Sequence, residues 1–438
     1  MTSSLFTDLY ELTMAASYHR HGLDRSATFE LFVRSLPERR NFLVACGQED
    51  VVAFLEGLSF GAEELAYLAS LDLFRSDFID YLGELRFTGD VRAVPEGEVV
   101  FATEPIVEVT APLIEAQLAE TFLINTVASQ TMVASKAARV AIACGGRPFV
   151  DFSARRDHGV DAAMQAARAA VIAGAAGTSL VAAGHRFGLE LSGTMAHSYV
   201  MAFTEEREAF RAYARDFPDN AVLLLDTYDT IEGARHAADV AVELAAEGIS
   251  IRGVRLDSGD LAGLAKQVRA ILDDAGLPEI RILASGDLDE DRVAALLATA
   301  APIDAFGVGT RMGVSEDAPS LGAVYKLVED AHGPKLKLSE GKSTLPGRKQ
   351  VWRFADHDVL ALDGEPMEGG RPLLVPAMKD GTRIAAHEPV PVLADRCRRA
   401  VAALPDHVRG LAPVDDSYEV RLSAGIVDLT RRLTEERD

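Results

Sequence analysis

Six short polar segments follow predicted apolar strands and hold most of the side chains that can do chemistry. They are Ser153-Ala154-Arg155-Arg156-Asp157-His158, Gly193-Thr194-Met195-Ala196-His197-Ser198, Asp226-Thr227-Tyr228-Asp229, Arg255-Leu256-Asp257-Ser258-Gly259-Asp260, Ser285-Gly286-Asp287 and Gly307-Val308-Gly309-Thr310. They bring carboxylates, arginines, small residues and two histidines to successive strand ends. Because α/β barrels and open α/β sheets bind ligands at the carboxyl ends of their strands, these segments form the candidate site.

Each residue type in these segments suits a phosphorylated sugar. Backbone N–H groups at Gly309-Thr310 and at Gly286-Asp287 can turn toward a phosphate. Asp287 and Asp257 can bind ribose hydroxyls or Mg²⁺, which favours one or two carboxylates together with substrate oxygens. The sequence therefore favours a phosphosugar site at this edge.

The remaining side chains add a cation and a nucleophile. Arg255 and Arg155 can hold a carboxylate or phosphate with two parallel hydrogen bonds, and His197 can act as base or nucleophile. Each signal alone also has an ordinary structural explanation, such as a turn for Gly-x-Gly, a helix N-cap for an Asp or a surface ion pair for Arg155. The coincidence of all six strand ends is what favours a site.

An alternation of strands and helices must position these segments. The predicted strands cover 149–152, 179–183, 189–191, 221–225, 251–256, 280–284 and 304–308, and amphipathic helices are predicted at 231–246 and 261–275. This order implies a parallel sheet with right-handed crossovers. About seven units suggest an α/β barrel, complete or incomplete, with a doubly wound open sheet as the alternative.

The two chain ends show a mixed pattern. We expect a helix at 7–21, a strand at 27–33, helices at 113–127 and 130–144, and mixed structure from 320 to 438. The C-terminal part completes the first domain or forms a third layer.

The composition and net charge of the chain argue against several classes of protein. The 438 residues suggest two or three domains, and 44 Lys and Arg against 67 Asp and Glu give a net charge of −23. This charge argues against binding to nucleic acid or to anionic membranes. The 3 cysteines lie far apart, the N-terminus carries acids where a signal peptide is basic, and the apolar run 169–184 is too short to span a membrane. We expect a cytoplasmic protein.

The ordered set of motifs resembles the nicotinate phosphoribosyltransferase family over nearly the whole chain. The matching segments are Thr7-Asp8-Leu9-Tyr10-Glu11-Leu12-Thr13, Phe29-Glu30-Leu31-Phe32-Val33-Arg34, Ser135-Lys136-Ala137-Ala138-Arg139, Asp151-Phe152-Ser153-Ala154-Arg155-Arg156, Gly193-Thr194-Met195-Ala196-His197-Ser198, Val254-Arg255-Leu256-Asp257-Ser258-Gly259-Asp260, Gly307-Val308-Gly309-Thr310 and Leu345-Pro346-Gly347-Arg348-Lys349-Gln350-Val351. Any one of these segments is weak evidence for the resemblance, whereas the ordered set is highly specific for the family.

The resemblance implies a type II phosphoribosyltransferase fold. An irregular, incomplete α/β barrel at 113–344 would join a split α/β sandwich built from both chain ends, 1–112 and 345–438. It also implies homodimers with shared active sites. The implied reaction joins nicotinate and phosphoribosyl pyrophosphate into nicotinate mononucleotide and pyrophosphate, the first step of NAD salvage from nicotinic acid. Mg²⁺ would be the cofactor, and ATP a co-substrate hydrolysed through a phosphohistidine, as in a ligase.

The resemblance assigns residues to the pyridine and the ribose. Phe152 and the partner subunit's Tyr10 would sandwich the pyridine ring, Thr194 and Arg255 would contact the nicotinate carboxylate, and Asp257 would face the ribose. Nicotinamide-specific relatives place an Asp where this chain has Met195. The resemblance therefore implies nicotinate as the substrate.

It also assigns the phosphate side. The 5-phosphate would be held by Gly286, Asp287, Gly309 and Thr310. His197 would become phosphorylated and Asp226 would orient its ring. Positive charge near the phosphates would come from Lys136, Arg139 and Arg155. The ligands of Mg²⁺ stay unassigned.

Two other classes stay open. An isomerase or aldolase on an α/β barrel would need a base or a Schiff-base lysine at a strand end, and no Lys lies directly at one of these predicted strand ends. A non-catalytic nucleotide sensor would have lost the His or an Asp, and here all are present.

Overall fold

The computed structural model describes residues 3–338, 344–414 and 418–436, and its internal contacts divide the chain into two units. Unit 1 comprises Met1–Ser135 and Ser320–Asp438, and unit 2 comprises Lys136–Pro319. The predicted boundaries lay at 112/113 and 344/345. They differ because helix α5 (Leu113–Leu118) packs on strands β1 (Ser26–Val33) and β5 (Pro105–Pro112), and strand β11 (Ala323–Asp330) pairs with β1.

Unit 1 is built on a seven-stranded sheet of order β12-β11-β1-β5-β3-β16-β17. Its other strands are β3 (Asp90–Ala93), β12 (Gly333–Pro334), β16 (Val375–Lys379) and β17 (Thr382–Arg383). Strand β1 lies between β5 and β11, antiparallel to both, and every residue after Ser26 in it is buried. The predicted strand at 27–33 is confirmed.

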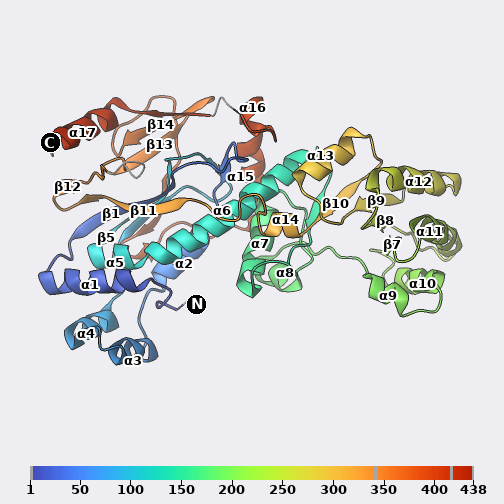
Figure 1. Ribbon diagram of the computed structural model, residues 1–438, viewed down its shortest axis with the longest axis horizontal. Coiled ribbons are helices and arrows are strands. Elements are labelled where there is room, and N and C mark those ends of the chain that lie inside the picture. The colour runs from blue at the N-terminus through green and yellow to red at the C-terminus, as the bar shows by residue number, and fades with distance from the viewer. Residues whose placement is uncertain (1–2, 339–343, 415–417, 437–438) are drawn as a thin grey trace. The chain divides into compact units, whose positions relative to one another are not determined.

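A four-stranded sheet of order β15-β13-β14-β18 and a two-stranded one, β2-β4, complete the strands of unit 1. They are β2 (Leu43–Val44), β4 (Val99–Val100), β13 (Lys349–Arg353), β14 (His357–Leu362), β15 (Arg371–Pro372) and β18 (Glu419–Leu422). The helices are α1 (Leu9–His21), α2 (Gln48–Glu56), α3 (Ala62–Ser70), α4 (Ser76–Glu84), α15 (Val390–Ala402), α16 (Asp406–Arg409) and α17 (Ala424–Glu435). Helix α1 packs on α5 beside the larger sheet (Figure 1), which confirms the helix predicted at 7–21.

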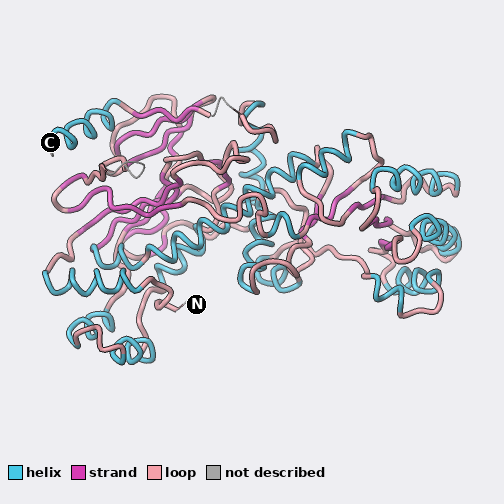
Figure 2. Tube along the Cα trace, viewed as in Figure 1, coloured by secondary structure: helices cyan, strands magenta, loops and turns pink. Residues whose placement is uncertain are grey.

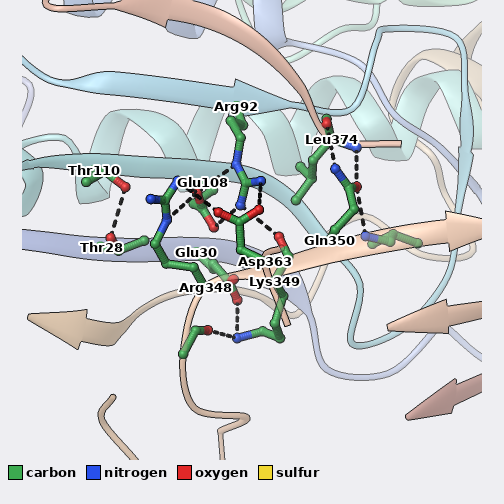
Figure 3. Close-up of polar contacts among 12 residues, drawn as sticks. Thr28, Glu30, Arg92, Glu108, Thr110, Arg348, Lys349, Gln350, Asp363 and Leu374 are labelled. Atoms are coloured by element: carbon green, nitrogen blue, oxygen red, sulfur yellow. Dashed lines mark hydrogen bonds and ion pairs between the residues drawn. The ribbon is translucent and has the colours of Figure 1, made fainter. Parts of the chain in front are cut away.

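Buried charges tie the larger sheet to β13 (Figure 3). Lys349 on β13 lies 2.8 Å from Glu30 on β1, with side chains 2% and 1% exposed. Arg92 on β3 donates to both carboxylate oxygens of Glu108, at 2.9 and 2.7 Å, and Arg348 lies 3.1 Å from the same carboxylate. Each buried carboxylate therefore has at least one cation, as burial of charge requires.

We expect Lys349→Met to destabilise the protein much more in mild alkali than in mild acid. Burial raises the pKa of Glu30 to about 7, although Lys349 opposes the shift. A raised pKa means that Glu30 favours folding at low pH and loses this contribution as the pH rises through about 7. At about pH 8.5 the variant would leave an unpaired buried carboxylate, costing about 3–5 kcal/mol of unfolding free energy, whereas at about pH 5 a neutral Glu30 needs no cation.

Urea unfolding at both pH values measures this difference. Lys379→Met is the matched control, because Lys379 forms an ion pair with Asp90 but is 59% exposed, and its loss should cost less than about 1 kcal/mol at either pH. A Lys349→Met cost that does not depend on pH would contradict the prediction.

Unit 2 is an incomplete parallel barrel. Its strands are β6 (Phe149–Asp151), β7 (Val222–Leu224), β8 (Gly253–Leu256), β9 (Arg281–Ala284) and β10 (Ala305–Val308), in the order β6-β10-β9-β8-β7. All four pairings are parallel, so the carboxyl ends of the strands share one edge. Single parallel bridges from Asp151 to Thr178 and from Thr178 to Leu191 extend the sheet beyond β6.

Two strand predictions in unit 2 need correction. The strand predicted at 179–183 is wrong, because helix α8 (Val181–Phe187) begins there and only Thr178 forms a bridge. The Ala-rich stretch favours helix over strand, and Gly188, whose φ of 65° lies in the left-handed region, ends the helix. The strand predicted at 189–191 is reduced to the bridge at Leu191. The other five predicted strands are confirmed to within two residues.

Helices flank these strands (Figure 2). They are α6 (Glu120–Ala143), which begins in unit 1, α7 (Val160–Ile172), α8, α9 (His197–Met201), α10 (Glu206–Asp216), α11 (Thr230–Ala245), α12 (Leu261–Asp274), α13 (Glu290–Ala298) and α14 (Thr310–Gly313). Helices α11 and α12 pack on β8, which confirms the helices predicted at 231–246 and 261–275. In the described part of the chain, no helix is long and apolar enough to cross a membrane.

Candidate active site

Arg255 is the centre of the cluster at the carboxyl edge of the unit 2 strands. Its guanidinium donates to the Thr194 hydroxyl at 2.7 Å and to the Ser285 hydroxyl at 3.0 Å, and lies 3.2 Å from an Asp257 carboxylate oxygen. The same group lies 5.8 Å from the centre of the Phe152 ring. Arg255 is thus oriented from three sides and presented beside an aromatic face, which suits a planar ring bearing a carboxylate.

Asp257 is held in its charged form. Partial burial favours the neutral acid, but the Ser285 hydroxyl, 2.6 Å away, and the Arg255 guanidinium outweigh this effect and lower the pKa of Asp257. A fixed negative charge therefore lies at the end of β8, where it can stabilise positive charge developing on a substrate.

His197 begins helix α9 and lies at the same edge. Its Nδ1 is 3.2 Å from the hydroxyl of Thr227, the residue after Asp226. Asp226, predicted to orient this ring, instead accepts from the Ser258 hydroxyl and from the Asp257 N–H at 3.3 Å. The other carboxylate oxygen of Asp226 is buried and has no hydrogen-bond partner among the described residues.

Glycines allow the Phe152 ring to lie against strand β10. A Cβ atom on Gly307 would lie 2.5 Å from the Phe152 ring, and one on Gly309 would lie 3.1 Å from its carbonyl oxygen. Any side chain at Gly307 would therefore push the ring away. The glycines of this segment serve the aromatic contact as well as the turn.

Two turns at this edge have unused backbone donors. Gly286 has φ 96° and a Cβ there would lie 2.0 Å from the Asp257 carbonyl oxygen, while Asp287 also has a positive φ of 49°. Within the described residues, the N–H groups of Gly286, Asp287 and Gly309 donate no hydrogen bond. Neighbouring N–H groups without partners can bind an anion such as phosphate.

Lys136 and Arg139, predicted near the phosphates, lie in buried ion pairs. Lys136 is 2.7 Å from Glu290 and 2.8 Å from Asp317, and Arg139 is 2.9 Å from Glu290. Both cations have side chains only 3% exposed. Arg155 differs from them, because it is exposed and available to an anion.

Tyr10 lies on α1 in unit 1 and is 46% exposed. Its place against a neighbouring subunit's site stays a prediction.

The sequence alone did not distinguish Ser285 and Thr227 from the other residues of the polar segments. The only sequence feature that could have indicated their role is a hydroxyl side chain directly next to Gly286 or Asp226. No cluster of three or more His, Cys, Asp or Glu suited to a metal occurs among the described residues.

Unit 2 is an incomplete parallel barrel with an aromatic ring, a cation and backbone N–H groups at one edge, and unit 1 is a sandwich built from both chain ends. This combination defines a type II phosphoribosyltransferase. Family models for nicotinate phosphoribosyltransferase match on both sides of the unit boundary, the N-terminal domain over residues 5–128 and the family proper over 148–329. The chain belongs to the nicotinate phosphoribosyltransferase family.

Relatives and a solved structure match this chain over most of its length. The chain is 49% identical over 435 residues to nicotinate phosphoribosyltransferase pncB2 of Mycobacterium tuberculosis, covering 98% of this chain and 94% of that protein. It is 46% identical over 370 residues to the Bacillus subtilis nicotinate phosphoribosyltransferase, covering 83% and 75%. The crystal structure of human nicotinic acid phosphoribosyltransferase matches with a TM-score of 0.87 at 28% identity, covering 98% of this chain and 99% of that one.

Proposed function

We propose that this chain transfers the phosphoribosyl group of phosphoribosyl pyrophosphate to nicotinate, releasing pyrophosphate, in the first step of NAD salvage from nicotinic acid. The observation that carries the proposal is Arg255, fixed by Thr194, Ser285 and Asp257 beside the Phe152 ring. A pyridine carboxylate needs this pairing of a cation and an aromatic face. Family membership supports the same reaction.

The phosphosugar would occupy the two turns. The unpartnered N–H groups at Gly286, Asp287 and Gly309 would receive the 5-phosphate, with Thr310 completing the second turn. In this arrangement C1 of the ribose would face the Asp257 carboxylate, which follows the neighbouring strand β8. The pyridine nitrogen then attacks C1 as pyrophosphate departs, and the charge of Asp257 stabilises the oxocarbenium-like transition state. Pyridine is already a nucleophile, so the protein mainly orients it.

Mg²⁺ and ATP belong to the proposal. Mg²⁺ binds few carboxylates and several substrate oxygens, and Asp226, with one buried oxygen lacking a partner in the described chain, suits this mode together with Asp257. When bound, Mg²⁺ neutralises charge on the departing pyrophosphate. ATP would phosphorylate His197, and hydrolysis of this phosphohistidine would drive synthesis in the cytoplasm.

An assay of substrate consumption tests the proposal. Phosphoribosyl pyrophosphate should disappear only when nicotinate is present, faster with Mg²⁺ and ATP, and the product should have the mass of nicotinate mononucleotide. An isomerase or aldolase would act without nicotinate, and a sensor would bind without turnover. Either result would reject the proposal.

The active sites are proposed to be shared between two subunits of a homodimer. Phe6, Leu9 and Tyr10 are 42%, 53% and 46% exposed, which makes an apolar patch at the start of α1 that a second copy would cover. In the family resemblance Tyr10 stacks on the pyridine of the neighbouring subunit. The patch supports this arrangement.

Mixing Tyr10→Ala and His197→Ala subunits should therefore restore the ATP-coupled activity that each variant alone lacks. If half of the subunits form mixed dimers, one of the two sites in each mixed dimer carries neither change, and activity should reach about one quarter of wild type. The measurement is turnover after subunit exchange, with exchange itself followed by native mass spectrometry. Confirmed mixed dimers without activity would contradict sharing.

A further inference from the structure

The two turns proposed to hold the 5-phosphate are joined by an ion pair that lies behind them. Asp289, two residues after Asp287, lies 2.8 Å from Arg311, the residue after Thr310. Asp289 also caps helix α13 by accepting from the Arg292 N–H at 2.9 Å. One pair of side chains therefore links the turn after β9 to the turn after β10.

Further contacts fix each turn separately. The Arg292 guanidinium donates to the Asp287 carbonyl oxygen at 2.9 Å, which fixes the following peptide plane in the positive-φ turn. Glu290, fully buried, receives Lys136 and Arg139 from helix α6. Lys136 also reaches Asp317, which follows α14, so α6 anchors the chain beyond both turns.

We propose that Asp289 and Arg311, supported by the buried pairs of Glu290, are positioning residues that set the spacing of the two phosphate-binding turns. The inference rests on the proposed function, because it assumes a phosphosugar at these turns. Its physical reason is that N–H groups on separate turns bind one phosphate well only if both are at the right distance from it. A displacement of about 1 Å can cost about a hundredfold in turnover.

Arg311→Gln and Asp289→Asn break the pair from opposite sides, and the asparagine keeps an oxygen that can still cap α13. Both variants should weaken binding of ribose 5-phosphate about tenfold and raise the KM for phosphoribosyl pyrophosphate by a similar factor. The KM for nicotinate should stay within about twofold, because Arg255 belongs to a separate set of contacts. Arg311→Lys, which keeps the charge, should recover part of the loss.

The two variants separate positioning from direct phosphate contact. If Arg311 binds the phosphate itself, Asp289→Asn would leave the arginine paired, among the described residues, only with Glu316, 3.3 Å away, and remove a negative charge, so ribose 5-phosphate would bind as well as before or better. That result overturns the proposal. Unchanged binding in both variants, or a parallel loss for nicotinate and the phosphosugar, overturns it as well.

Arg211→Gln is the matched control. Arg211 pairs with Glu243 between α10 and α11 at 2.9 Å, and its side chain is 31% exposed, as is that of Arg311. This variant should leave ribose 5-phosphate binding unchanged. Calorimetric binding of ribose 5-phosphate does not require turnover, so it tests the positioning even if the proposed reaction is not observed. Absence of ribose 5-phosphate binding to the wild-type protein would overturn the inference.

Discussion

Replacing Arg255 with glutamine is expected to lower kcat/KM for nicotinate by about a thousandfold, or ~4 kcal/mol of transition-state stabilisation. The change removes the cation proposed to pair with the substrate carboxylate. It also leaves Thr194, Ser285 and Asp257 without the donor that they now share. Steady-state kinetics with nicotinate as the varied substrate measure the loss.

The control for this variant is Arg252→Gln. Arg252 immediately precedes β8 and is exposed, so its replacement should change kcat/KM by less than about twofold. Binding of ribose 5-phosphate should survive in the Arg255 variant, since the guanidinium reaches the turn at Gly286 only through the Ser285 hydroxyl and not through the backbone N–H groups proposed to hold the phosphate. A variant that keeps wild-type nicotinate turnover would remove Arg255 from the site.

The same cluster predicts selectivity for nicotinate over nicotinamide. Arg255 offers donors to an anion, and the neighbouring residue of the loop is Met195, whose carbonyl oxygen lies 3.4 Å from the guanidinium. Met195 offers no side-chain carboxylate to accept from the NH₂ of a neutral amide at this position of the loop. Arg255→Gln should therefore lower turnover of nicotinate far more than turnover of nicotinamide. Comparable turnover of the two substrates by the wild-type protein would contradict the assignment.

His197→Ala is expected to abolish the coupling of ATP hydrolysis to product formation, while slow transfer without ATP survives. Phosphorylation needs an imidazole nitrogen, whereas Phe152 stacking and the Arg255 contacts do not depend on it. Labelling with γ-labelled ATP should give acid-labile, base-stable phosphate on the wild type and none on the variant. This is a complete loss of one activity from a single side chain.

His185→Ala serves as its control, because His185 is exposed on α8 and the labelling should be unaffected. Label that persists in the His197 variant would show that another residue carries the phosphate. Thr227→Val tests the contact at Nδ1: loss of this neighbour should slow labelling without abolishing it.

Much of unit 2 could be predicted from sequence because parallel strands buried on both faces are continuous apolar runs. The apolar runs of β8, β9 and β10 are each followed by polar residues, and the structure brings these polar residues together at the carboxyl edge of the sheet. The strand predicted at 179–183 failed because an Ala-rich apolar run suits a short helix equally well. The local sequence pattern cannot distinguish a strand from a short helix in such a segment.

Ion pairs between residues far apart in the sequence could not be predicted either. Lys136 and Arg139 are typical of a phosphate site by type, yet their partners Glu290 and Asp317 are more than one hundred residues away in sequence. No local spacing reveals such pairs. Likewise, Asp226 was the natural partner for His197, whereas the contact is made by the adjacent Thr227. Hydroxyl groups carry too little sequence signal for this role to be predicted.

A crystal structure of this protein with nicotinate mononucleotide and Mg²⁺ would show directly which residues hold the pyridine carboxylate and the 5-phosphate. We expect the pyridine ring against Phe152, its carboxylate on Arg255 and Thr194, and the 5-phosphate on the N–H groups of Gly286, Asp287 and Gly309. A nucleotide bound elsewhere, or bound with its phosphate on Arg255, would contradict it.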